Sequence, residues 1–145
     1  MSIDGRYDSD NIFAKILRGD APCVKVYEDD HVLAFMDIFP QSDGHTLVLP
    51  KAAARNLLDL DDDALKETMI RVKRLATAIR TALNPDGIIV TQFNGAPAGQ
   101  TVFHTHFHII PRWVGPPLGQ HGGGQADMDV LTAQADAIAQ AIKTG

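Results

Sequence analysis

The sequence has little cysteine and no long apolar run. Because Cys23 is its only cysteine, an intramolecular disulfide and a cysteine-rich zinc module are both excluded. No apolar stretch approaches the roughly 20 residues that span a bilayer, and the polar, acidic first ten residues do not resemble a secretory signal. A lone thiol agrees with a reducing compartment, so we expect a cytoplasmic protein without a membrane partner.

Basic residues are also scarce. Thirteen lysines and arginines stand against eighteen acidic residues, which gives a formal net charge of −5. A field of that sign opposes the phosphate chains of DNA and RNA, so we expect no nucleic-acid partner. A small anionic ligand held by local hydrogen-bond donors remains compatible with this charge.

The pattern along the 145 residues predicts one α+β domain. Caps and apolar spacing predict a short helix after Asn11, a long helix that begins at residues 61–63 and ends at Asn84, and a final helix across residues 131–142. Strand signals cover residues 24–27, 32–38, 46–49, 87–93 and 102–110, in an order that favours a mostly antiparallel five-stranded sheet. We expect a core domain in residues 1–112, flexible over about its first ten residues, and a tail in residues 113–145 with a Gly/Pro-rich connector and a helix.

Three histidines alternate near the end of the predicted core. His104, His106 and His108 are spaced by two, which on a strand places all three on one face. The residues between and beside them would then take the opposite face and pack on the core: Phe103, Thr105, Phe107 and Ile109.

Three interpretations of this row are open. A solvent-facing row without function is the least specific, but three alternating histidines add no packing and would accumulate like charge if protonated. A metal site is the second; two neighbouring histidines can share one zinc ion, with further ligands from elsewhere such as His45 or an acid. The third is nucleophilic catalysis by a central imidazole that its two neighbours orient, and the geometry of the row suits this interpretation best.

Other residues near the row are candidates for a ligand site. His45 lies where a loop enters a strand, and Asp37 ends a strand, where its carboxylate can accept hydrogen bonds from ligand hydroxyls. Residues 99–101, Gly-Gln-Thr, lead into the row and bring backbone freedom and side-chain donors. The sequence has neither the P-loop pattern nor Gly-x-Ser-x-Gly, so those two enzyme classes are excluded.

Residues 104–110, His-Thr-His-Phe-His-Ile-Ile, resemble the histidine triad motif, His-x-His-x-His followed by two apolar residues. Segments 11–16, 34–38, 45–51 and 99–102 are similar to the same superfamily, in its order and at its spacing. The resemblance covers roughly residues 10–112. It implies a homodimer whose subunits pair strands into one continuous sheet.

The resemblance also implies an activity: hydrolysis or transfer of nucleoside monophosphates from purine nucleotide conjugates, such as those of AMP or GMP. His106 would attack the α-phosphorus and form a nucleotidyl-histidine, from which water releases the monophosphate. His104 and His108 would orient His106 and stabilise the phosphoryl oxygens, and His45 would support them. No metal or other cofactor is expected, because imidazoles and backbone donors can meet the charge.

The same resemblance predicts the nucleotide-binding residues. Asp37 would hold the ribose hydroxyls, and Gln100 and Thr101 would contact the phosphate or leaving group. Five apolar residues would line the base pocket: Ile12, Phe13, Ile16, Phe35 and Ile38. Asn94 would lie at the phosphate end, and Gly99 and Val102 complete the predicted site.

Two features depart from the family pattern. Some bacterial relatives carry a Cys-x-x-Cys that forms part of a structural zinc site, but Asn11 and Ala14 stand at those positions here, so we expect no structural zinc. The tail after residue 112 lies outside the match. Because such tails partly determine leaving-group selectivity in this family, the resemblance does not decide whether the leaving group of the substrate is an amine or a nucleotide. A non-catalytic nucleotide sensor or scaffold is the alternative function, and a metalloprotein using two of the histidines is a third.

Overall fold

The computed structural model describes residues 2–119 and 123–144, so the predicted connector's His121 lies outside the described residues. All strand pairs of its five-stranded sheet are antiparallel, in the order β1-β2-β3-β5-β4. The strands are β1 (Lys25–Glu28), β2 (Val32–Met36), β3 (Thr46–Pro50), β4 (Gly87–Thr91) and β5 (Phe107–Arg112). The predicted α+β class and five-stranded sheet are therefore confirmed.

Three helices complete the fold, and local caps explain where they begin and end. They are α1 (Ile12–Leu17), α2 (Asp62–Leu83) and α3 (Met128–Thr144), with two short 3-10 turns, η1 (Leu57–Asp59) and η2 (Ala96–Ala98). The side chains of Asn11 and Asp61 accept hydrogen bonds from the first turns of α1 and α2. Asn84 ends α2 in the left-handed conformation. The predicted helices are thus confirmed.

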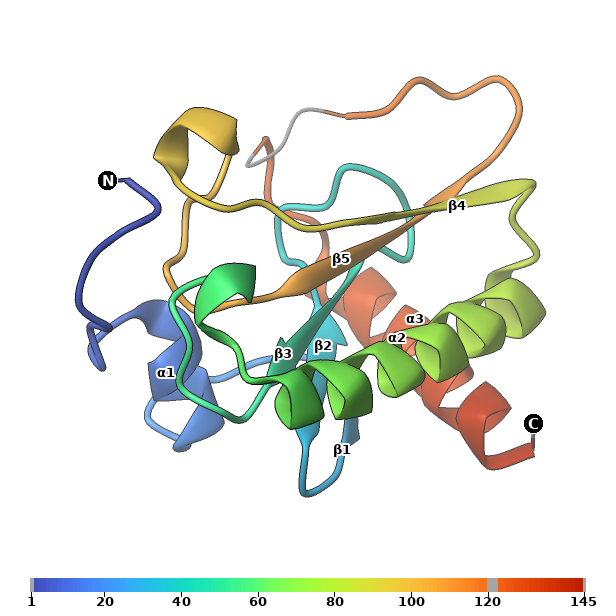
Figure 1. Cartoon of the computed structure of the whole chain (residues 1–145). Coiled ribbons are helices and arrows are strands. Elements are labelled where there is room, and N and C mark those ends of the chain that lie inside the picture. The colour runs from blue at the N-terminus through green and yellow to red at the C-terminus, as the bar shows by residue number, and fades with distance from the viewer. Residues whose placement is uncertain (1, 120–122, 145) are drawn as a thin grey trace.

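Alternate residues of the strands point to two different faces of the sheet. On the helix face, Val32, Val48 and Ile109 pack against α2 and α3 in the larger core. Figure 1 shows these two helices beside each other, and α1 separate from them at the other end of the sheet. On the opposite face, called the cleft face here, Leu33 and Leu47 pack with residues of α1 and its surroundings in a smaller cluster.

The strand predicted over residues 102–110 is wrong at its start. Strand β5 begins only at Phe107, because the preceding residues bend to satisfy long-range hydrogen bonds. The backbone N–H and the hydroxyl of Thr105 both donate to Ala54 O, at 2.8 and 2.9 Å. The three histidines therefore do not share one strand face. Phe107 and Ile109 do pack in the core as predicted, whereas Phe103 stacks under the guanidinium of Arg55.

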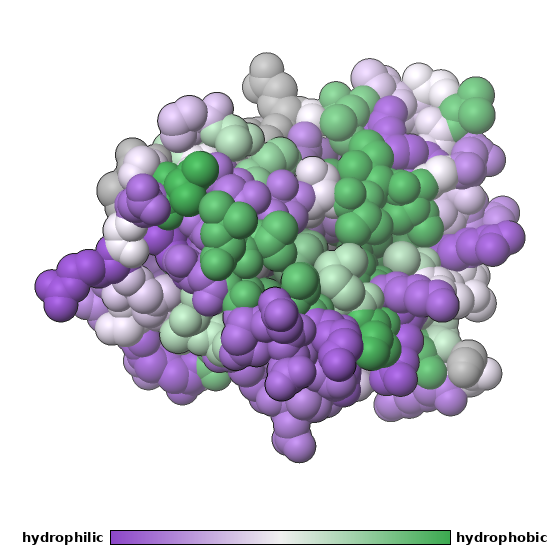
Figure 2. Space-filling model, in the orientation of Figure 1, coloured by the Kyte–Doolittle hydropathy of each residue, from purple (hydrophilic) through white to green (hydrophobic). Residues whose placement is uncertain are grey.

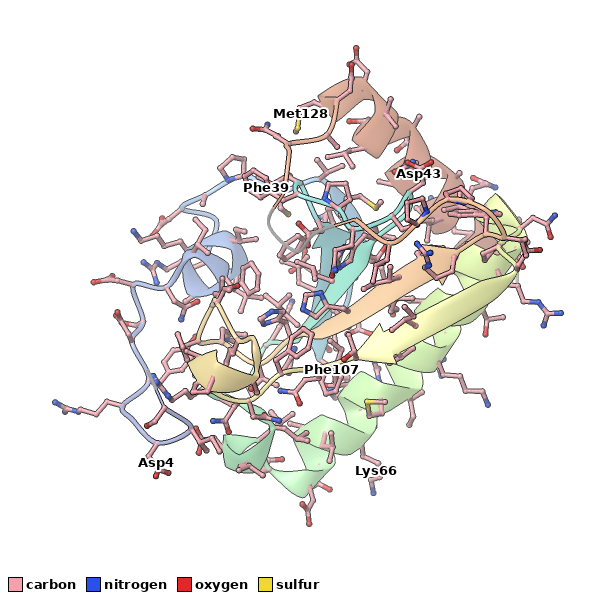
Figure 3. All side chains as sticks on the ribbon, turned by 90° about the horizontal axis from the view of Figure 1, so that it is seen from above. Asp4, Phe39, Asp43, Lys66, Phe107 and Met128 are labelled. Atoms are coloured by element: carbon pink, nitrogen blue, oxygen red, sulfur yellow. The ribbon has the colours of Figure 1, made fainter. Side chains whose placement is uncertain are left out.

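Both ends of the chain lie on the body of the domain. Ser2 and Ile3 are bound through their carbonyls by side chains of the β3–α2 connection, although the sequence predicted a flexible start. The C-terminal connector reaches the loop after β2, where Gly119 N donates to Gln41 O and Ala126 N donates to Ile38 O. Phe39 and Met128 accordingly lie at the same end of the molecule in Figure 3. Among the described helices, none combines the length and apolar character that crossing a membrane requires.

Candidate active site

A cleft of about 530 Å³ opens on the cleft face between α1, the ends of β2 and the segment before β5. Most of its wall is apolar, and the polar side chains in it are few: Asp37, Thr101, His106 and His108. His108 lies beside both Asp37 and His106, so these three form a polar end of the cleft. Such a wall suits a flat apolar ligand with one polar end. The apolar lining residues are Ile12, Phe13, Ile16, Ala21, Pro22, Cys23, Phe35, Met36, Ile38, Phe39, Leu47 and Val102.

His106 is held in one orientation at the polar end of the cleft. Its Nδ1 lies 2.7 Å from the backbone carbonyl of His104, and a carbonyl can only accept, so Nδ1 carries the proton. The lone pair of the neutral ring is then on Nε2. The Phe13 ring meets the imidazole edge-on, with 4.8 Å between centroids. The arrangement presents an imidazole of fixed orientation in the cleft wall.

A second network fixes the hydrogen-bonding roles of His45 and His108. The backbone N–H of Gln41 donates to His45 Nδ1 at 3.0 Å, so a neutral His45 carries its proton on Nε2. That nitrogen lies 2.9 Å from His108 Nδ1 and 3.5 Å from a carboxylate oxygen of Asp37. His108 Nδ1 is thus an acceptor, and the His108 proton is on Nε2. His108, part of the cleft wall, is therefore a hydrogen-bond donor beside His106.

His104 lies behind His106 and is not among the residues that line the cleft. Its ring is fully buried between Pro50 O, 2.8 Å from Nε2, and the Tyr7 hydroxyl, 2.6 Å from Nδ1. Burial lowers the pKa of His104, an effect that the hydrogen bond to the Pro50 carbonyl partly opposes. A neutral His104 is consistent with both hydrogen bonds, because Nε2 donates and Nδ1 accepts.

Three of these side chains also form the one cluster in the described chain with the composition of a metal site. Ligand atoms of Asp37, His45 and His108 all lie within 4.8 Å of one another, and the residues are buried. A cation there would bind a lone pair on His45 Nε2. In the hydrogen-bonded network that nitrogen carries a proton, which it donates to His108, so the proton would have to leave before the cation could bind. The metal interpretation thus competes directly with the hydrogen-bonded network.

The structure brings most of the predicted site residues together but not all of them. Eight of the predicted nucleotide-binding residues line the cleft: Ile12, Phe13, Ile16, Phe35, Asp37, Ile38, Thr101 and Val102. Asn94 instead accepts from Leu57 N and lines a separate shallow hollow beside residues 2–4. His45 stands behind His108, outside the lining.

Gln100 braces the loop before the histidines. Its buried amide accepts from Gly95 N at 2.8 Å and donates to Arg55 O and Val102 O. The amide binds these backbone groups in this conformation, and the phosphate contact by Gln100 stays a prediction. Gly99 lies in the same loop with a φ of +110°, which residues that carry a side chain rarely adopt.

Sequence reasoning missed several residues that hold the histidines. Tyr7 contacts His104, Gln41 fixes His45, and Phe93 meets the His108 ring at 5.4 Å between centroids. Gln41 acts through its backbone, which no side-chain pattern reveals. Tyr7 lies in a short polar stretch with no periodicity, so its long-range contact left no local signal.

Known proteins are similar to this chain along most of its length. The HIT domain family model matches residues 18–114. The "Protein hit" of Bacillus subtilis is 49% identical over 102 residues, which are 70% of each chain. The Adenosine 5'-monophosphoramidase hnt1 of Schizosaccharomyces pombe is 46% identical over 101 residues, covering 70% of this chain and 73% of that one.

A solved structure extends the similarity to the C-terminal helix. The crystal structure of a HIT-like protein from Bartonella henselae superposes with a TM-score of 0.90 at 48% identity, over 94% of this chain and 99% of that chain. The match by family model, sequence and fold agrees with the buried histidine network described above. This chain therefore belongs to the HIT, or histidine triad, family.

Proposed function

We propose that the chain cleaves purine nucleotide conjugates at the α-phosphate through a nucleotidyl-histidine on His106. The observation that carries the proposal is the hydrogen bond from His106 Nδ1 to the His104 carbonyl, which leaves the lone pair on Nε2 in the cleft wall. A neutral imidazole with a fixed tautomer is a competent nucleophile at neutral pH. The relative from Schizosaccharomyces pombe that carries the name of an adenosine 5'-monophosphoramidase adds support.

The reaction has two steps with phosphorus as the reacting centre. His106 Nε2 forms a bond to the α-phosphorus while the bond from phosphorus to the leaving group breaks, and the leaving group keeps the electron pair and takes a proton. Water then attacks the same phosphorus while the P–Nε2 bond breaks and its electron pair returns to Nε2. The proton that the water loses goes to solvent and balances the proton taken up by the leaving group, so the products are the nucleoside monophosphate and regenerated His106. His108 Nε2–H supplies a donor for a phosphoryl oxygen in both steps.

The rest of the cleft fits the remainder of a purine nucleotide. The apolar wall contributed by Phe13 and Phe35 suits a purine ring, and Asp37 lines the same cleft with a carboxylate oxygen 3.5 Å from His45 Nε2. One carboxylate oxygen of Asp37 accepts from Phe39 N at 2.8 Å, which fixes the side chain for ribose hydroxyls. Carboxylate acceptors give stronger hydrogen bonds than neutral ones.

The test is turnover of adenosine 5'-phosphoramidate and diadenosine triphosphate side by side, with and without EDTA. We expect release of AMP that resists EDTA and disappears in His106→Ala, and the faster substrate identifies the class of leaving group. Mass spectrometry of wild type after an alkaline quench, which preserves the acid-labile P–N bond, should show one covalent AMP. Loss of activity with EDTA would favour a metal at Asp37, His45 and His108. Tight AMP binding without turnover would favour the sensor or scaffold function.

We also propose that the chain forms a homodimer through strand β4 and helix α2. Strand β4 ends the sheet, and its Ile89 and Val90 are 36% and 46% exposed. Figure 2 shows apolar side chains gathered over the middle of the face where β4 and α2 lie in Figure 1. An exposed apolar edge strand is a ready surface for pairing with a second copy.

Light scattering after size exclusion tests the dimer. Wild type should have the mass of a dimer and Val90→Lys that of a monomer. The control is Val130→Lys, because Val130 is similarly exposed, at 48%, but lies on α3. A monomeric wild type at tens of micromolar, or dimers in both variants, would exclude this interface.

A further inference from the structure

The first residues form a strap that the rest of the domain binds through hydrogen bonds. This N-terminal strap, Ser2–Tyr7, is bound by the chain that follows β3: Arg55 Nη2 donates to Ser2 O at 3.0 Å and Asn56 Nδ2 donates to Ile3 O at 2.8 Å. Figure 3 places Asp4 of the strap at the edge of the molecule far from Met128.

Arg55 gives the strap a specific anchor. Its side chain is buried, with 3% of the residue exposed, and its guanidinium lies 4.3 Å over the Phe103 ring. Within the part of the chain that the structure describes, no carboxylate lies at ion-pair distance from Arg55. The hydrogen-bond acceptors of the guanidinium are carbonyls of the strap, Ser2 O and Arg6 O. A buried cation needs such partners, so the strap position is specified.

The strap ends at the first histidine of the triad. Tyr7 packs edge-on against His104, with 5.6 Å between ring centroids, and its hydroxyl lies 2.6 Å from Nδ1. Since His104 Nε2 must donate to the Pro50 carbonyl, Nδ1 of the neutral ring can only accept, and Tyr7 donates to it. Tyr7 and Pro50 together therefore fix both the tautomer and the orientation of the His104 ring.

His104 passes this constraint to the proposed nucleophile. Its own carbonyl accepts the proton of His106 Nδ1 at 2.7 Å, and this bond sets which nitrogen of His106 bears the lone pair. The backbone of His104 lies in the bent segment before β5, outside the strand pairing. Its carbonyl shares a peptide group with Thr105 N–H, which donates to Ala54 O at 2.8 Å. The bonds at both His104 nitrogens add a second restraint, through the side chain, on the residue whose carbonyl orients His106.

We propose that Tyr7 is a positioning residue for His106, acting through His104 without contacting the substrate. The inference rests on the proposed function, in which His106 is the nucleophile. The N-terminal strap then contributes to catalysis through a chain of contacts. Arg55 and Asn56 hold the strap in position, and Tyr7 of the strap holds the His104 imidazole. The cleft wall itself does not include Tyr7, so substrate affinity should not depend on it.

Tyr7→Phe tests the proposal, because it removes the hydroxyl and keeps the ring. We expect kcat to fall about tenfold, the value of one neutral hydrogen bond, while KM stays within about twofold. The matched control is Tyr27→Phe on strand β1, which loses the hydroxyl bond to Asp29 and lies outside the cleft lining. The control should keep the kcat and KM of wild type.

Nitrogen NMR of the histidine rings separates positioning from a general loss of stability. In Tyr7→Phe, the ¹⁵N resonance of His104 Nδ1 should move, and the His106 ring should change from one tautomer to a mixture. Unchanged kcat in Tyr7→Phe, an equal loss in Tyr27→Phe, or an unaltered His106 ring would each overturn the proposal. If wild type releases no AMP, the proposed function fails, but the NMR comparison still decides whether Tyr7 orients His106.

Discussion

The two faces of the sheet use the same strands for different tasks. On the helix face, Val32, Val48 and Ile109 are buried under α2 and α3, and the core there is mostly aliphatic. On the cleft face, the neighbour of Ile109 along β5 is His108, which lines the cleft with His106. Two neighbouring residues of one strand thus have different roles: Ile109 stabilises the fold, and His108 lines the cleft. Substitutions on the two faces should therefore have separable effects.

The largest effect should come from the cleft face at His106. His106→Ala removes the proposed nucleophile, so we expect kcat to fall at least about a thousandfold. The free energy of unfolding should change by less than about 1 kcal/mol, since the residue borders an open cleft. AMP release and urea unfolding measure the two quantities. Wild-type turnover by this variant would remove His106 from the mechanism.

A substitution on the helix face should show the opposite pattern. Ile138 of α3 is fully buried, and Ile138→Ala should reduce the free energy of unfolding by about 2–5 kcal/mol. The kcat of the folded fraction should stay near that of wild type. Val130→Ala is the control, since Val130 is 48% exposed on the same helix. A large loss of kcat in fully folded Ile138→Ala would show that the two faces are not separable.

Substitution of Asp37 tests whether the proposed substrate contacts on the cleft face include residues other than the histidines. Asp37→Asn keeps the size of the side chain but removes the charge, so we expect kcat/KM for a ribonucleotide conjugate to fall about tenfold to a hundredfold. A 2',3'-dideoxy substrate should be cleaved equally by both proteins. An equal loss with that substrate would assign Asp37 to the His45 contact instead of to the ribose.

The smallest expected effect is a pH dependence of stability from His104. Because burial lowers its pKa in the fold, the unfolded chain takes up this proton at higher pH than the folded chain does. Its contribution is fully present above about pH 6.5, the unfolded value, and is lost as pH falls below it, by at most about 1.4 kcal/mol per pH unit. Urea unfolding between pH 7.5 and 5.5 measures the slope. An NMR pKa for His104 at or above that of free histidine would contradict the assignment.

Elements with local signals could be predicted from the sequence. Asp61 and Asn84 mark the ends of α2 through a cap and a left-handed residue, and both act within one turn of their own position. The apolar cleft residues follow from the resemblance, and six of them line one cavity together with Asp37 and Thr101. Short-range chemistry and a specific motif therefore account for the sheet, the helices and most of the cleft.

Features set by contacts between distant segments could not be predicted. The bend before β5 depends on Ala54 O, about fifty residues upstream, and it overrides the alternating pattern that favoured a longer strand. Gln100 looked available to a ligand, but its amide is taken up by Gly95 N, Arg55 O and Val102 O. In each case, the partner is a backbone group, which carries no sequence signal.

The C-terminal helix links the order of synthesis to the order of folding. Leu131 and Ile138 of α3 belong to the same core as β1, β2 and α2, so that core is complete only after residues 128–144 have left the ribosome. All residues from His45 to His108 emerge earlier, while the helix face is still uncovered and prone to association. We expect nascent chains stalled before residue 128 to be cut readily by protease and those extended beyond residue 144 to resist. Equal resistance would show that the earlier residues fold without the helix.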